Sequence, residues 1–124
     1  MCIRDSYVAG AQLPVPLLAV VLRKAYGLGA MAMLGGDLRV PLLTLAWPTG
    51  EFGPMSLEGA VRLGARRELE ALPPEAREAR YAELVAQSYA QGRALNVASA
   101  FEVDDVVDPA DTREVLVRAL AGLA

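Results

Sequence analysis

The sequence predicts an α/β fold, in which helices cover a small parallel sheet. Two continuous apolar runs, at residues 17–22 and 42–47, are typical of strands buried on both faces of such a sheet. Helical periodicity follows over much of residues 56–92. The order of strand, short helix, strand and then several helices favours the α/β class over an all-helical or all-strand fold.

The length and composition suit one small domain. The chain has 124 residues, of which 54% are hydrophobic and 22% charged, a composition that can fill a core and argues against disorder. A unit this small leaves much of its surface uncovered. We therefore expect the core to continue into further chain or into a partner, with an apolar seam exposed where it does.

Composition also excludes several kinds of site. The chain has no His and a single Cys2, so a His-based triad, a His metal site, structural zinc and an internal disulfide are excluded. We expect no metal in this chain. The net charge is −3 with mixed signs, which argues against a nucleic-acid partner. The longest apolar run, residues 13–22, is too short to span a bilayer. We expect no membrane contact and a cytoplasmic protein.

The first six residues are interpreted as a non-native leader. Residues 1–6 resemble translated adapter sequence, so the expected domain covers residues 7–124.

The first half of the chain holds the predicted strands. The run at 17–22 is the first strand, and Gly27-Leu28-Gly29 then breaks the chain. Residues 30–34 can form about one helical turn before Gly35-Gly36 stops it. The second strand, 42–47, is closed by Pro48, and an irregular loop is predicted through residues 50–54.

Helices dominate the second half. Ser56 is predicted to cap a helix that runs to about Leu72. Pro73-Pro74 begins the next helix, which Gly92 ends. A short strand is predicted over residues 101–107. Residues 108–111 then cap a last helix, whose buried side carries Leu116, Ala119, Leu120 and Leu123.

The glycine turn at residues 27–30 is the leading candidate site. A strand that feeds this turn and a helix start leaves several backbone N–H groups unpaired, and two of them aimed at one point can form an oxyanion hole. An ordinary tight strand-to-helix turn explains the same residues. The spacing Gly27, Gly29, Ala32 also matches the dinucleotide-binding fingerprint, but the long crossover helix that this motif requires does not fit before Gly35.

Three other features have simpler explanations. The acidic cluster at residues 104–111 is interpreted as solvated strand-end charges and a helix cap rather than a metal site. A solvated helix face explains Arg62, Arg66 and Arg67 better than an anion site does. Trp47 is interpreted as part of the core or of a wall.

Three segments, in this order, resemble the carboxyltransferase subunits of biotin-dependent acyl-CoA carboxylases. Residues 20–30, VVLRKAYGLGA, are similar to the family's "RKAYGGA" segment. Ala46-Trp47-Pro48-Thr49, followed by Met55 and residues 58–61, resembles "AWPTAE…MG.EGAV". Residues 101–109 with Thr112-Arg113 resemble the closing "VDDVIDP.ETR".

The resemblance implies a crotonase/ClpP-like fold, of which this chain is the C-terminal part of the second carboxyltransferase half-domain. It implies transfer of carboxylate from carboxybiotin to the α-carbon of an acyl-CoA, while two backbone N–H groups stabilise the biotin ureido oxyanion. A gapless match places these donors at Leu28 and Gly29, and a shift of one residue would place them at Gly29 and Ala30. Tyr26 and Gly27 are candidates for the biotin pocket.

The implied cofactor is biotin, carried on a biotin carboxyl carrier or biotin carboxylase partner. An acyl-CoA substrate and a homo-oligomer of carboxyltransferase subunits are implied as well, and the segment alone is expected to be inactive. Two alternatives stay open: the carboxyltransferase subunit of a biotin-dependent decarboxylase, and a noncatalytic assembly or binding module.

Overall fold

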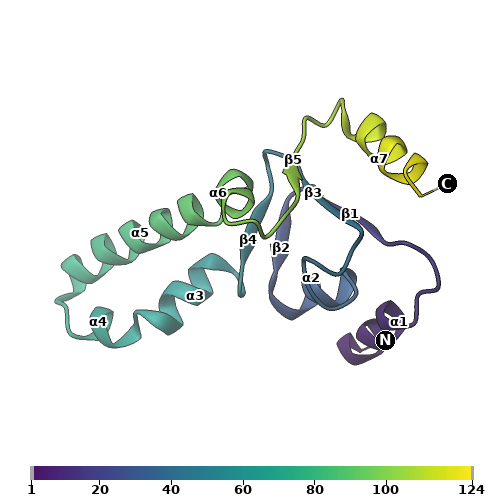
Figure 1. The fold of residues 1–124 in the computed structure, drawn as a ribbon. Helices are drawn as coiled ribbons and strands as arrows, with labels where there is room; N and C mark the ends of the chain where they lie inside the picture. The colour runs from purple at the N-terminus through teal and green to yellow at the C-terminus, as the bar shows by residue number, and fades with distance from the viewer. Residues whose placement is uncertain (1, 124) are drawn as a thin grey trace.

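Two small parallel sheets organise the computed structural model, which describes residues 2–123 (Figure 1). The first sheet has the strand order β1-β3-β5, with β1 at Leu18–Val21, β3 at Leu43–Ala46 and β5 at Asp105–Val106. The second pairs β2, Lys24–Tyr26, with β4, Glu51–Gly53. The predicted α/β class is therefore confirmed.

The two predicted apolar strands are confirmed as β1 and β3. They pair in parallel with Leu18 opposite Leu43 and Val21 opposite Ala46. Leu45 and Ala46 are completely buried, because elements cover both faces of β3. The main core cluster joins residues from β1, β3, β4, α6 (Ala94–Ser99) and the segment before β5: Val21, Ala46, Phe52, Ala94 and Val103.

The irregular loop predicted for residues 50–54 is wrong over residues 51–53, which form β4. This strand pairs with β2 in the register Lys24 to Glu51, Ala25 to Phe52 and Tyr26 to Gly53. Neither strand carries the apolar run of a buried strand, so only their pairing across the fold defines them.

The helix after the glycine turn, α2, spans Gly27–Met33 and so begins earlier than predicted. Its predicted end is confirmed, since Gly35 and Gly36 have φ values of 81° and 139°, in the region that favours glycine. The N–H of Gly36 donates to the carbonyl of Met31 at 2.8 Å, which satisfies a carbonyl of the last turn.

A helical arm of α3, α4 and α5 projects from the sheets (Figure 1). The single helix predicted from Ser56 to Leu72 is wrong in one respect, because α3 (Leu57–Gly64) and α4 (Arg66–Glu70) are separated at Ala65. The Ser56 cap is confirmed by its hydroxyl, which accepts from the N–H of Gly59. The next helix, α5 (Pro74–Gln91), begins and ends as predicted, with Gly92 as its C-cap.

The end of the chain departs most from the prediction. The unpredicted helix α6 occupies residues 94–99, and the strand predicted over 101–107 is reduced to the two residues of β5. Phe101 explains the difference, since its φ of 60° turns the chain and prevents an extended start. The carboxylate of Asp104 then accepts the N–H of Thr44 at 2.7 Å, which joins this segment to β3.

Helices at both ends complete the described chain. The predicted last helix is α7, Thr112–Ala121, but none of its residues is buried, so the face predicted to be covered is open. An unpredicted helix, α1 (Ile3–Ala11), packs against α2 and includes part of the segment interpreted as a leader. Whether residues 1–6 are native stays a prediction.

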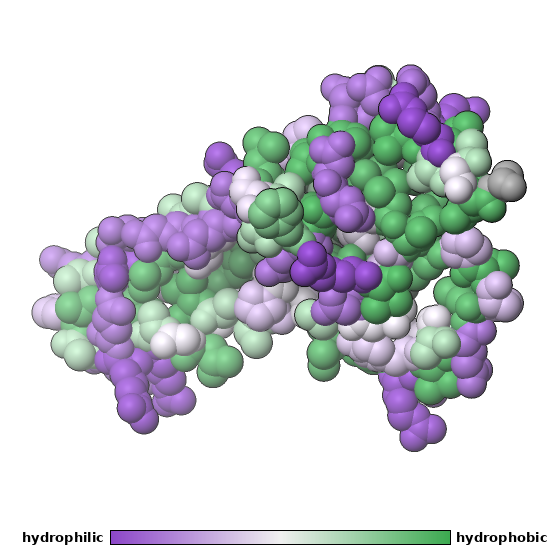
Figure 2. All heavy atoms as spheres, viewed as in Figure 1, coloured by the Kyte–Doolittle hydropathy of each residue, from purple (hydrophilic) through white to green (hydrophobic). Residues whose placement is uncertain are grey.

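Apolar side chains lie exposed over much of the surface. Among residues 2–123, sixteen large hydrophobic residues are exposed, including Leu28, Leu42 and Phe101. Figure 2 shows hydrophobic residues gathered where Figure 1 places the sheets and α7. Among the helices of residues 2–123, none combines the length and apolar character needed to cross a membrane.

Candidate functional site

The turn between β2 and α2 requires glycine at its first position. Gly27 has φ +56°, and a Cβ atom there would lie 2.6 Å from the carbonyl oxygen of Pro54. A side chain would therefore be strained by the backbone conformation and would also collide with a neighbouring main chain. The close approach fixes the start of α2 against the end of β4.

Helix geometry leaves two donors free at this turn. Tyr26 is the N-cap residue, so its carbonyl takes the first intrahelical hydrogen bond, from the N–H of Ala30. The N–H groups of Leu28 and Gly29 come before that bond and have no intrahelical partner. Leu28 is 65% exposed, and a Cβ at Gly29 would meet nothing within 4 Å. The two donors therefore lie beside open space.

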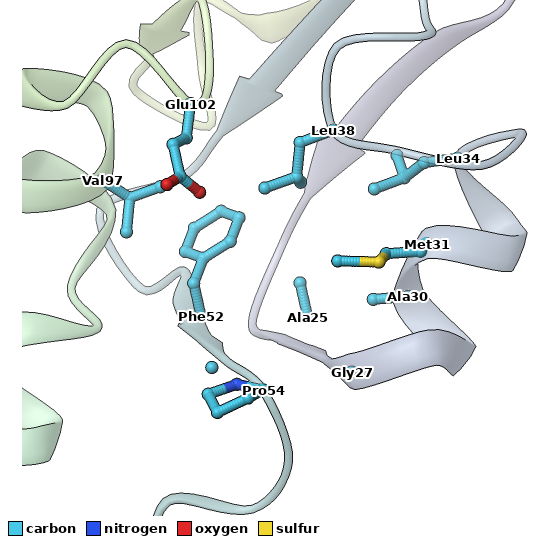
Figure 3. Close-up of a pocket in the computed structure, with 11 residues that line it drawn as sticks. Ala25, Gly27, Ala30, Met31, Leu34, Leu38, Phe52, Pro54, Val97 and Glu102 are labelled. Atoms are coloured by element: carbon cyan, nitrogen blue, oxygen red, sulfur yellow. The ribbon is translucent and has the colours of Figure 1, made fainter.

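An apolar cavity of about 290 Å³ opens beside the same turn (Figure 3). Figure 3 shows Met31 of α2, Leu34 at the C-cap of that helix, Phe52 of β4, and Leu38 converging on the cavity. Gly27, Ala30, Pro54 and Val97 lie at its walls, and Glu102 is the charged residue among those that line it. The cavity therefore suits an uncharged group of moderate size, with Gly27 at one side.

Tyr26 and Gly27 lie differently with respect to this cavity, although both are biotin-pocket candidates. Gly27 lines it, whereas the Tyr26 hydroxyl donates to Oε2 of Glu51 at 2.9 Å. Burial, followed by the hydrogen bond to Glu51, raises the pKa of the Tyr26 phenol well above its usual value. The phenol is thus a neutral donor at any pH near neutrality.

A second tyrosine–glutamate pair lies in the helical arm. The Tyr89 hydroxyl of α5 donates to Oε1 of Glu58 in α3 at 2.5 Å. This hydrogen bond lowers the pKa of the Glu58 carboxyl and raises that of the Tyr89 phenol. The pair has the same chemistry as Tyr26 and Glu51 but joins two helices, and it lies close enough for Tyr89 and Glu58 to add to the rise in the pKa of the Tyr26 phenol.

The three sequence segments that carry the family resemblance meet in space. Nε1 of Trp47 donates to Oγ1 of Thr112 at 2.9 Å, which ties the second segment to the third. The Thr49 hydroxyl donates to the carbonyl of Leu22 at 2.6 Å, beside the first segment. These motif residues therefore hold the strand ends in place, in agreement with the structural interpretation of Trp47.

The features with simpler explanations are engaged in hydrogen bonds and ion pairs with other residues of the fold, some near in the sequence and some distant, such as Asp104 with Thr44. The carboxylates of Asp104, Asp105 and Asp108 accept backbone N–H groups, and residues 2–123 contain no group of three or more His, Cys, Asp or Glu that could hold a metal ion. On the arginine face, Arg66 pairs with Glu70, and Nε of Arg62 donates to the Tyr81 hydroxyl.

Sequence reasoning missed the residues that surround the turn from other elements. Phe52, Val97 and Glu102 line the cavity, and Glu51 holds Tyr26. Their contribution depends on pairing between distant segments. The one local signal is the β-branched and aromatic content near these positions, which is too weak to assign them a role.

A parallel sheet, a glycine turn with free main-chain donors and an adjoining apolar cavity define a crotonase-like α/β domain, the class to which the structural relatives belong. The carboxyl transferase domain family matches residues 8–124, and the chain belongs to that family.

Two relatives place the chain within the family. The structure of a single-chain, multi-domain long-chain acyl-CoA carboxylase is 51% identical and superposes with a TM-score of 0.77, over 94% of this chain and 11% of that one. The methylmalonyl-CoA carboxyltransferase 12S subunit of Propionibacterium freudenreichii subsp. shermanii is 38% identical over 90% of this chain and 21% of its own length. A transcarboxylase 12S crystal structure superposes with a TM-score of 0.81 at 35% identity, over 96% of this chain and 22% of that one.

A decarboxylase subunit is also similar. The methylmalonyl-CoA decarboxylase subunit alpha of Veillonella parvula is 34% identical over 94% of this chain and 21% of its own length. The chain thus spans about a fifth of the length of the curated relatives it matches.

Proposed function

We propose that this segment forms the C-terminal part of a carboxyltransferase subunit that moves carboxylate from carboxybiotin to the α-carbon of an acyl-CoA. The observation that carries the proposal is the helix start at Leu28 and Gly29, whose N–H groups have no intrahelical partner, between two residues, Gly27 and Ala30, that line a largely apolar cavity in a chain of the carboxyl transferase family. An acyl-transfer or proton-shuttle site built on His is excluded by the composition of this segment.

The residues at the turn fit a biotin ring. Its bicyclic system is uncharged and largely apolar, and the cavity is close to the lower end, roughly 300 Å³, of the range for small-molecule sites. Met31, Phe52 and Leu34 would contact the ring. We propose that its ureido oxygen lies at the edge of the cavity, toward Leu28 and Gly29, which stand in the chain between the lining residues Gly27 and Ala30. Bound carboxybiotin would supply the carboxylate and a ureido oxygen that gains negative charge as the carboxylate leaves.

The role of this segment in that reaction is electrostatic. Backbone N–H groups held by a sheet and a helix need no reorganisation when charge develops, and the loss of one such donor costs about 10²- to 10³-fold in rate. Leu28 is acceptable at a donor position because its main chain acts and its side chain points to solvent. Ala30 is the weaker candidate, since its N–H makes the first bond of α2.

The remaining parts of the proposed site lie in other segments of the subunit and in its partners. We propose that a biotin-carrying partner delivers the carboxylate, that the upstream half of the subunit supplies most of the acyl-CoA site, and that the subunit forms a homo-oligomer in the cytoplasm. The unburied α7 and the exposed apolar side chains around the sheets support a continued interface.

A decarboxylase complex is the second candidate, favoured by the likeness to the Veillonella parvula subunit. Both candidates use the same donors, and they differ in what accepts the carboxylate. The full-length subunit should carboxylate an acyl-CoA from carboxybiotin in the first case. In the second case the subunit should transfer the carboxylate of a carboxyacyl-CoA to biotin, in the presence of a membrane partner.

Substitution of Leu28 tests the donor assignment in the full-length subunit. Leu28→Pro deletes one N–H in the first turn of a helix, where proline is tolerated, whereas Leu28→Ala keeps the N–H. We expect Leu28→Pro to lower kcat by about 10²- to 10³-fold and Leu28→Ala to stay near the unsubstituted enzyme. Equal activity of the two variants, with both folded by circular dichroism, would refute the assignment.

A further inference from the structure

We infer that Glu51 is a positioning residue for the proposed carboxyl transfer, because it holds Tyr26 and through it the turn that carries Leu28 and Gly29. The inference rests on the proposed function. It adds a residue that lies 25 positions from its partner in the sequence and outside the lining of the cavity.

Tyr26 connects the second sheet to the donors. It is the last residue of β2 and the N-cap of α2, so any rotation of its backbone moves the first turn of the helix. The N–H groups of Leu28 and Gly29 lie only two and three residues beyond it. The position of the Tyr26 side chain is therefore coupled to the direction of both donors.

Three contacts hold that side chain. In the β2–β4 pairing, Tyr26 lies opposite Gly53, and a Cβ built at Gly53 would be 3.6 Å from Cδ1 of the ring. The ring thus lies across a position where the strand has no side chain. Its hydroxyl reaches Oε2 of Glu51 at 2.9 Å, and Nζ of Lys24 lies 5.7 Å from the ring centroid.

Glu51 is itself fixed by main-chain contacts on both sides. Its N–H donates to the carbonyl of Arg23 at 2.5 Å, and an antiparallel bridge joins it to Arg93. The acceptor of the Tyr26 hydroxyl therefore belongs to a residue anchored in the sheet. The raised pKa of the phenol keeps it protonated, so the hydrogen bond persists across the neutral range.

Such a hold matters because oxyanion donors act only at short range. Donors must lie about 2.7–3.1 Å from the oxygen that gains charge. A displacement of about 1 Å can cost about 10²-fold in rate. Without Glu51 the Tyr26 ring keeps its place over Gly53 but loses the hydrogen bond of its hydroxyl. The first turn of α2 then becomes more mobile, and the N–H groups of Leu28 and Gly29 no longer keep a fixed direction.

The pair Tyr89 and Glu58 supplies a matched control. It joins α5 to α3 through the same kind of hydrogen bond, 2.5 Å long, and has no proposed part in the reaction. Truncation of this pair removes one tyrosine–carboxylate hydrogen bond, as truncation of Tyr26 and Glu51 does, but it removes no hydrogen bond of Tyr26 and acts on the phenol only through longer-range electrostatics.

The test uses the full-length subunit, with kcat and KM for carboxyl transfer measured alongside hydrogen exchange of residues 30–34. We expect Tyr26→Phe and Glu51→Ala each to lower kcat by about 10- to 100-fold, to leave KM for the acyl-CoA within about threefold, and to speed exchange in α2. The double variant should be no worse than either single one. Glu51→Gln, whose amide oxygen still accepts the hydrogen bond, should restore kcat to within about threefold.

Several outcomes would overturn the inference. Glu51→Ala with unchanged kcat and exchange would do so, as would Tyr89→Phe and Glu58→Ala lowering kcat as much as the Tyr26 and Glu51 variants. Equal loss in Glu51→Gln and Glu51→Ala would assign the effect to charge rather than position. Failure of the proposed function is separate, since it appears as an inactive unsubstituted subunit, while exchange in α2 still reports whether Glu51 holds the turn.

Discussion

Two glycines of one turn should respond in opposite directions to the same substitution. At Gly27 the φ of +56° costs an L-residue about 1–2 kcal/mol. A Cβ 2.6 Å from the Pro54 carbonyl oxygen adds about 1–3 kcal/mol, because a main-chain neighbour must move. The lower entropy of an unfolded chain with Ala returns about 0.4–1 kcal/mol. Gly27→Ala should therefore destabilise the fold by about 1–5 kcal/mol.

Gly29→Ala is the matched substitution two residues away. Gly29 lies within α2, and nothing lies within 4 Å of its added Cβ. The higher helix propensity of Ala should stabilise the chain by about 0.5–1 kcal/mol. Urea unfolding followed by circular dichroism measures both changes. Shifts of the same sign for the two variants would refute the assigned geometry of the turn.

Three further predictions concern stability. Ser56→Ala removes the cap of α3 and should cost about 1 kcal/mol in urea unfolding, while Ser56→Gly costs a few tenths; an equal cost would argue against the side-chain cap. Phe101→Asn should raise the melting temperature, because Asn tolerates the left-handed backbone at φ 60° and the exposed Phe ring buries little; a lower melting temperature would contradict this. The hydrogen bond from Tyr89 lowers the pKa of Glu58 below its ordinary value of 4.5. The stability that this carboxylate contributes is therefore present above pH 4.5 and is lost as the pH falls through the pKa of Glu58 in the folded state. Glu58→Gln should flatten the acid limb of the stability curve, and an unchanged limb would show that the pair contributes nothing.

The sequence predicts best those elements whose signal is local. The runs at 17–22 and 42–47 became β1 and β3 because both faces of these strands are buried and the residues are apolar throughout. The ends of α2 and α5 were predictable from Gly35, Pro74 and Gly92, whose backbone preferences act within a few residues.

Elements that are defined by long-range contacts could not be predicted from the sequence. The strands β2 and β4 have three residues each and no distinctive pattern, so only their mutual pairing marks them. The break at Ala65 interrupts an unbroken helical periodicity, and nothing in the local pattern marks it. Pairing and packing between distant segments override local propensity and leave no local signal.

The same distinction holds at the site. The glycine turn is predictable because Gly27 and Gly29 break the chain within three residues, and Gly27 takes the left-handed backbone that favours glycine. Tyr26 was noticed only as a neighbour of that turn, and its partner Glu51 was not connected with it, since 25 residues separate them. The cavity needs β4, α6 and the chain before β5 to converge, and no local pattern specifies that convergence.

The last prediction is that this chain alone does not catalyse carboxyl transfer. The proposed reaction needs carboxybiotin and acyl-CoA to meet with donors for both, and we propose only one such pair among the residues described here, at Leu28 and Gly29. Loss of a whole substrate site removes the positioning contribution, on the order of 7–11 kcal/mol. Loss of a donor adds about 2.7–4 kcal/mol. The two together should bring turnover below detection.

The assay compares residues 7–124 with the full-length subunit. Each is incubated with a labelled carboxybiotin donor and a panel of acyl-CoAs, and label in the acyl-CoA is measured. We expect transfer by the full-length subunit alone. Transfer by the short chain at a comparable rate would mean that one pair of donors and one apolar cavity form a complete site. In that case the exposed faces of α7 and of the sheets would need another explanation than continuation into the rest of a carboxyltransferase.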